Sequence, residues 1–148
     1  MRYLSFIFIL ITTASFSQVI DYNVKKGFIA NGYDVVAYFN NEAIEGNKQF
    51  KTMFDGVYYK FHSDKNLTAF NKNPKKYVPQ FGGYCAYAIA EKSEKVSINP
   101  KTFEIINGKL YLFYNAWGTN TLELWQKENT KELLENADKN WRKIKLTK

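Results

Sequence analysis

The chain has 148 residues, of which 45% are hydrophobic and 24% are charged, and its formal net charge is +7. This length and balance fit one globular domain and exclude a wholly disordered chain. One cysteine and one histidine exclude an internal disulfide bond and the four-ligand zinc modules. Among the 21 basic residues only Arg2 and Arg142 are arginine, and the lysines are scattered, so nucleic-acid binding is not predicted.

The first 17 residues have the layout of a secretory signal peptide. Arg2 precedes an apolar run over residues 3–12, and small residues follow directly before Gln18. The apolar run is shorter than the ~20 residues that a membrane-spanning helix needs. We therefore expect residues 1–17 to be a signal peptide that is removed. The mature chain, 18–148, would be periplasmic or secreted, without a stable membrane anchor.

Two turn signals predict two β-hairpins in the mature chain. Residues 18–31 show little periodicity and are expected to form an extended lead-in. Asp55-Gly56 and Asn107-Gly108 each separate two strand-like runs, and both pairs suit tight hairpin turns. Beyond the first turn Val57, Tyr59 and Phe61 lie on one strand face, which we expect to be buried. The predicted strands are residues 48–54 and 57–62, then 103–106 and 109–114.

Helical signals follow each hairpin. Ser63 suits the N-cap of a short helix that ends near Asn71. Gly82-Gly83, ahead of a compact apolar run, indicates a close approach of the backbone to the core. Over residues 122–144 apolar side chains recur at three- and four-residue spacings, which predicts helix. The expected fold is α+β: a single small domain with two β-hairpins and several short helices.

Three residues are candidates for a chemical site. His62 follows the first hairpin and suits a metal ligand or an acid–base group, although Lys60 on the same strand face favours a solvent-exposed histidine. Cys85 is either a shielded core thiol or part of a site. Asp34 either completes a site with His62 and Cys85 or caps the turn that follows it.

Signatures of known enzyme classes are missing from the sequence. It contains no Gly-x-Ser-x-Gly elbow, no phosphate-binding loop, no dinucleotide fingerprint and no paired metal-binding histidines. Enzymatic activity is therefore not predicted. A redox enzyme built from His62, Cys85 and a tyrosine remains a third alternative, behind metal binding and non-metal ligand binding.

Five motifs stand out in the mature chain: 32–38 (GYDVVAY), 59–63 (YKFHS), 74–80 (PKKYVPQ), 81–86 (FGGYCA) and 107–112 (NGKLYL). Taken together, these motifs resemble the YHS domain family. The likeness covers residues 30–145, and Trp125 and Trp141 add to it. The likeness is to the exported, stand-alone bacterial members of this family rather than to the short modules fused to metal-transporting ATPases. The resemblance implies a YHS-like domain over residues 18–148.

The resemblance implies a possible transition-metal site. The fused modules are similar to treble-clef-like (TRASH-like) metal sensors, in which cysteines are thought to bind heavy metals such as copper. Here residues 61–63 (FHS) stand where those modules read Phe-Cys-Ser, and their upstream cysteine has no counterpart. The remaining set of His62, Cys85 and Asp34 suits copper or iron better than closed zinc coordination. The alternative is a non-metal module that binds a small ligand or a protein partner through a tyrosine-rich surface.

Overall fold

The first hairpin forms where the sequence predicts it. The computed structural model describes residues 19–146 and pairs β3 (Asn47–Phe54) with β4 (Val57–Phe61) in antiparallel register. Because side chains alternate along a strand, Tyr59 and Phe61 are buried while Tyr58 is exposed on the outer face. The predicted burial of this strand face is confirmed.

The segment before this hairpin is not a plain extended lead-in. β1 (Val24–Lys25) and β2 (Phe28–Ile29) pair antiparallel, and β2 then pairs parallel with β4. The result is a four-stranded sheet in the order β1-β2-β4-β3. Strands of two residues leave no readable period in a sequence, which is why the pattern does not predict them.

The second predicted hairpin is shared by two hydrophobic cores. β5 (Asn99–Ile106) pairs with β6 (Lys109–Phe113) around the expected Asn-Gly turn. Successive residues of a strand point to opposite faces. Accordingly, Leu112 packs in one buried cluster and Phe113 in the other. The hairpin therefore lies between the two cores and joins them.

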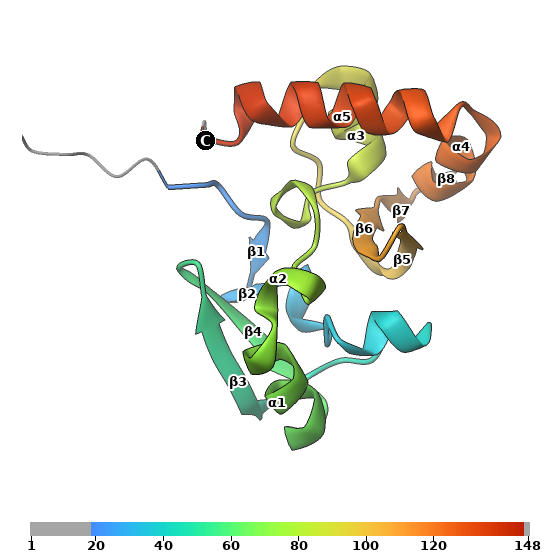
Figure 1. The fold of residues 1–148 in the computed structure, drawn as a ribbon. Helices are drawn as coiled ribbons and strands as arrows, with labels where there is room; N and C mark the ends of the chain where they lie inside the picture. The colour runs from blue at the N-terminus through green and yellow to red at the C-terminus, as the bar shows by residue number, and fades with distance from the viewer. Residues whose placement is uncertain (1–18, 147–148) are drawn as a thin grey trace, which may run out of the picture.

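The predicted cap and helix after the first hairpin are confirmed. The Ser63 hydroxyl accepts a hydrogen bond from the backbone N–H of Asn66 at 3.3 Å and starts α1 (Asp64–Lys72). The fully buried ring of Phe70 packs against Tyr59 and Phe61. Helix α1 thereby covers the inner face of the sheet (Figure 1).

The C-terminal helical region is confirmed as helix but forms two helices. α4 (Thr121–Lys127) and α5 (Thr130–Ile144) are each capped by an asparagine, Asn120 and Asn129, whose side chain accepts a backbone hydrogen bond. Helix α5 packs across α3 (Ala86–Lys92) (Figure 1). The sequence pattern did not predict α3 as a helix.

Two tyrosines of this region are tied to carboxylates. The Tyr84 hydroxyl donates to Asp21 Oδ2 at 3.0 Å, and the Tyr87 hydroxyl donates to Glu128 Oε1 at 2.7 Å. Burial, followed by the hydrogen bond to Asp21, raises the pKa of Tyr84 to about 12. The hydrogen bond to Glu128, followed by burial, raises the pKa of Tyr87 to about 12. Both hydroxyls therefore stay neutral across the physiological pH range.

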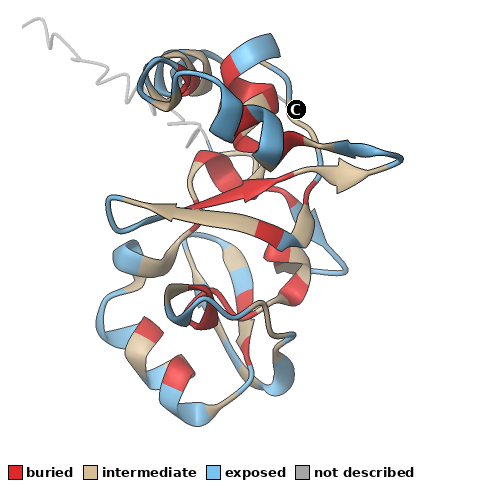
Figure 2. Cartoon of the chain, turned by 90° about the vertical axis from the view of Figure 1, so that its right-hand side faces the viewer, coloured by how far each residue is buried: buried red, intermediate tan, exposed pale blue. Residues whose placement is uncertain are grey.

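The architecture is α+β, as predicted: a single small domain with two hairpins and several short helices. Buried residues gather between the elements, and exposed ones lie on the outer turns (Figure 2). Within residues 19–146 none of the helices combines the length and apolar character needed to cross a membrane. The predicted signal peptide, 1–17, lies outside the described residues. The remaining short elements are α2 (Pro74–Tyr77), β7 (Asn115–Ala116), β8 (Thr119–Asn120), η1 (Ala30–Gly32), η2 (Ala37–Asn40) and η3 (Phe81–Gly83).

Candidate functional site

Asp34 is a fully buried carboxylate that ties two distant segments together. Its Oδ1 accepts hydrogen bonds from the backbone N–H groups of Val36 at 2.9 Å and Ala37 at 3.2 Å. Its Oδ2 accepts from the backbone N–H of His62 and from Nδ2 of Asn66, both at 2.9 Å. Asp34 therefore caps the turn after it, which is one of its two predicted roles, and also fixes the end of β4.

The same carboxylate orients the ring of His62. Nδ1 of His62 lies 2.8 Å from Oδ2 of Asp34, and the histidine side chain is 39% exposed. An ionised carboxylate can only accept hydrogen bonds, so we assign the ring hydrogen to Nδ1. Nε2 has no hydrogen-bond partner within the described part of the chain. It is therefore the ring nitrogen available to a ligand.

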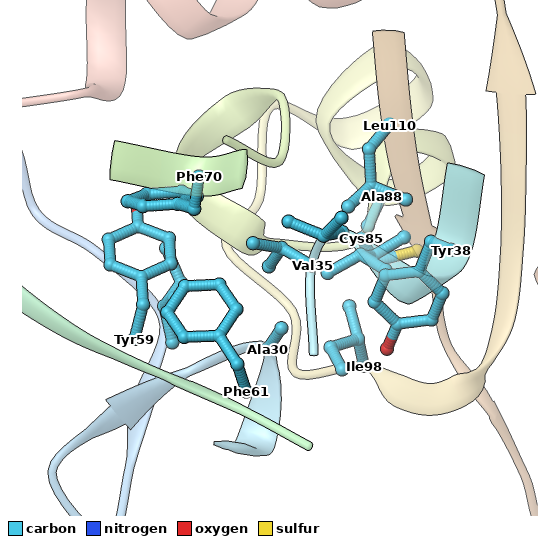
Figure 3. Close-up of a cluster of buried hydrophobic side chains, with 13 residues drawn as sticks. Ala30, Val35, Tyr38, Tyr59, Phe61, Phe70, Cys85, Ala88, Ile98 and Leu110 are labelled. Carbon is cyan, nitrogen blue, oxygen red and sulfur yellow. The ribbon is translucent and has the colours of Figure 1, made fainter. Parts of the chain in front are cut away.

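Cys85 is a shielded thiol with hydrogen-bond partners of its own. It lies in the core among Val35, Ala88 and Tyr38 (Figure 3) and has no exposed surface. The Tyr114 N–H donates to Sγ at 3.3 Å, and Sγ lies 3.3 Å from Oγ1 of Thr121. Because the Thr121 hydroxyl donates to the Tyr114 carbonyl at 2.8 Å, the thiol is the donor to Thr121. These bonds join the start of α3 to the start of α4.

The three predicted metal ligands do not combine into one metal site. The structure brings Asp34 and His62 together, but five N–H groups already bond to the two oxygens of Asp34. The sulfur of Cys85 is sealed in the core. Across residues 19–146 no group of three or more His, Cys, Asp or Glu side chains is placed to hold a metal ion. Of the three predicted ligands, only His62 has a ligand atom at the surface. Copper or iron binding therefore stays a prediction, and the arrangement of these three residues fits it poorly.

A basic hollow opens beside the outer face of the sheet. It has a volume of about 490 Å³ and includes one carboxylate, that of Glu45. When charges of one sign dominate a cleft, counter-ions of the opposite sign become concentrated there. We call this hollow the lysine pocket, and the lining residues that matter most are Lys25, Lys26, Lys48 and Lys60, together with Phe28 and Tyr33.

An adjoining surface hollow extends the lysine pocket to His62. His62 contributes to its lining, and it shares Glu45, Lys48 and Lys60 with the lysine pocket. The alternation along β4 explains this arrangement, since Lys60 and His62 lie two residues apart on the same side of the chain. A ligand at Lys60 would therefore have the imidazole within the same connected surface depression.

Lys60 is the largely buried cation of the pocket. Its side chain is only 11% exposed, and its Nζ lies 3.1 Å from Oε1 of Glu45 and 5.4 Å from the centre of the Phe28 ring. The side chain of Glu45 is 67% exposed. Water therefore already solvates most of the Glu45 carboxylate, and an incoming anion can take its place at Lys60.

Two glycines allow the backbone to pack closely around Lys60. A Cβ atom on Gly46 would lie 2.5 Å from the carbonyl carbon and oxygen of Lys60. A Cβ atom on Gly32 would lie 2.2 Å from Cε of Lys60, and Gly32 has a φ of +82°. A larger residue at either position would have to displace part of the pocket.

The backbone around the pocket is irregular. The register of β3 against β4 shifts between Asn47 and Lys51, so Lys48 lies on a bulged segment. Ala30 and Asn31, next to the pocket, have positive φ angles of 51° and 54°. Bulges re-aim side chains, so the bulge bears on the direction of Lys48. Positive φ also occurs away from the pocket, at Phe81, Ser93 and Trp117, and therefore does not mark this region as functional.

The lysine pocket was not predicted from the sequence. There Lys60 indicates an exposed strand face, and the remaining lysines are scattered along the chain. The spacing of Lys60 and His62 on one strand was the readable signal. Lys25 and Lys48 join them only through the pairing of β2 with β4 and the bulge of β3.

No family model, no curated protein and no solved structure matches the chain. The resemblance to YHS domains therefore rests on the sequence motifs alone and stays a prediction.

Proposed function

We propose that the protein is an exported domain that binds a small anionic ligand, of the phosphate or carboxylate class, in the lysine pocket. The observation that carries the proposal is the set of four lysines around one hollow of about 490 Å³, with a single carboxylate in its lining. This volume lies in the usual range of ligand sites, roughly 300–1,000 Å³. The excess of basic over acidic residues adds long-range attraction for anions.

Lys60 would be the main anchor for the anion. Its side chain is already ordered by Glu45 and the Phe28 ring, so little further side-chain freedom is lost on binding. A hydrogen bond to a charged group contributes about 1.5–3 kcal/mol, which corresponds to about 10- to 100-fold in affinity. Lys25 and Lys48 would add longer-range attraction from the rim.

His62 would contact the part of a ligand that reaches the adjoining hollow. The bond between its Nδ1 and Asp34 fixes the ring plane, and Nε2 is left for the ligand. A fixed donor or acceptor beside a cluster of lysines adds direction to an otherwise diffuse attraction. We therefore assign His62 a positioning role for the ligand.

A second hollow, near the other end of the sheet, supports anion binding less well. It has a volume of about 420 Å³ and combines Lys75 with two carboxylates, Asp55 and Asp138. The Asp55 carboxylate already accepts a hydrogen bond from the Tyr22 hydroxyl. The opposed charges at this hollow give no preference for one sign of ligand.

Calorimetric titration of the folded protein with inorganic phosphate tests the proposal. We expect saturable binding to the wild type and an affinity at least about 10-fold lower for Lys60→Met. Lys131→Met, which removes an equal charge from an exposed position on α5, should bind as the wild type does. Equal affinities of the wild type and Lys60→Met, or no binding to the wild type, would overturn the proposal.

A further inference from the structure

A row of paired residues crosses the outer face of the sheet beside the lysine pocket. The register pairs Lys25 with Phe28, Phe28 with Tyr58, and Tyr58 with Met53. Side chains of directly paired residues point to the same face of a sheet. These four side chains therefore form one continuous row across all four strands, opposite the face that buries Tyr59.

This row presents aromatic surface to solvent. Tyr58 is 43% exposed and Met53 is 54% exposed. The rings of Phe28 and Tyr58 lie 6.3 Å apart with their planes inclined by 58°. Ammonium groups flank both rings, because Nζ of Lys60 lies 5.4 Å from the Phe28 ring and Nζ of Lys51 lies 5.7 Å from the Tyr58 ring. Cations and aromatic rings thus lie side by side on this face.

Phe28 makes the aromatic row continuous with the lysine pocket, since it belongs to both. An anionic group bound at Lys60 would lie beside the Phe28 ring, with Tyr58 next along the row. An isolated exposed aromatic residue on a strand needs no special explanation. Here, however, the exposed ring adjoins a cationic hollow, and a ligand of matching size could contact both.

We infer that the ligand of the lysine pocket carries a planar aromatic group next to its anionic group, as an aryl phosphate or an aromatic carboxylate does. This inference rests on the proposed function and names its ligand class. The anionic group pairs with Lys60, and the aromatic group lies against Phe28 and Tyr58. Contacts between aromatic rings add about 3- to 10-fold in affinity.

Two phosphate esters of equal charge test the ligand class. Phenyl phosphate and methyl phosphate would be titrated into the folded protein, and we expect phenyl phosphate to bind about 3- to 10-fold more tightly. Tyr58→Ser should reduce this preference and leave the affinity for methyl phosphate unchanged. Trp117→Ser, which removes an exposed aromatic ring from the turn between β7 and β8, should keep the full preference.

The outcomes separate the ligand class from the anion site itself. Equal affinities of the wild type for both esters would overturn the aromatic ligand class and leave the anion site standing. A preference that survives in both Tyr58→Ser and Phe28→Leu would also overturn it. Failure of both esters to bind would overturn the proposed function together with this inference.

Discussion

Replacing Asp34 with asparagine should strongly destabilise the fold. Asp34 is fully buried, and its two oxygens accept five hydrogen bonds, two at Oδ1 and three at Oδ2. An amide keeps one oxygen and turns the other into a donor. Whichever way the amide faces, at least two buried N–H groups then lose their acceptor. At about 1–3 kcal/mol for each orphaned donor, Asp34→Asn should cost about 2–6 kcal/mol, out of a typical total of about 5–15 kcal/mol.

Urea unfolding followed by circular dichroism measures this loss. The midpoint for Asp34→Asn should fall while the slope of the free energy against urea stays that of the wild type. Asp138→Asn, at an exposed position on α5, is the matched control and should change stability by less than about 0.5 kcal/mol. If Asp34→Asn proved as stable as Asp138→Asn, the role of Asp34 as the tie between its own turn and His62 would be refuted.

Three further predictions concern separate parts of the structure. Gly46→Ala should cost about 1–3 kcal/mol in the same unfolding assay, because the new Cβ would overlap the backbone of Lys60; wild-type stability would contradict the close approach. Cys85 should react with a thiol reagent only after unfolding, since its sulfur has no exposed surface, and rapid labelling of the folded protein would disprove the shielding. Tyr84 and Tyr87 have pKa values raised from 10.0 to about 12 in the folded protein, so the stability they contribute is complete below pH 10 and is lost as the pH rises through about 12. Ultraviolet absorbance of tyrosinate should show at least two tyrosines titrating near pH 12, and titration of every tyrosine near pH 10 with the fold intact would contradict this.

Elements specified by a few neighbouring residues could be predicted from the sequence. Both hairpins follow from an Asx-Gly turn between alternating runs, and α1 follows from the cap at Ser63. The sheet beyond the first hairpin could not be predicted, because β1 and β2 are two residues long and are held by pairing with β4. Helix α3 was missed because its run of small and apolar residues has no helical period distinct from a buried strand.

Two residues of the site could be predicted from the sequence, but their arrangement in space could not. Asp34 and His62 were both singled out, but their contact joins residues 28 positions apart and depends on how the turn after Asp34 packs against β4. Cys85 was grouped with them on residue type alone, and its hydrogen bonds lead to Thr121 instead. The lysine pocket was missed because its cations come from β1 and the turn after it, the β3 bulge and β4, which only the folded chain brings together.

The most direct test of the anion site is to map which backbone amide NMR signals shift when phosphate is added. The account predicts that the amides of Gly32, Gly46 and Lys60 shift together with one dissociation constant. Glu45→Gln should lower that constant, because it removes the carboxylate that competes for Lys60, whereas Lys60→Met should raise it at least about 10-fold. Shifts scattered over exposed lysines throughout the surface, with the same midpoints in Lys60→Met, would contradict it.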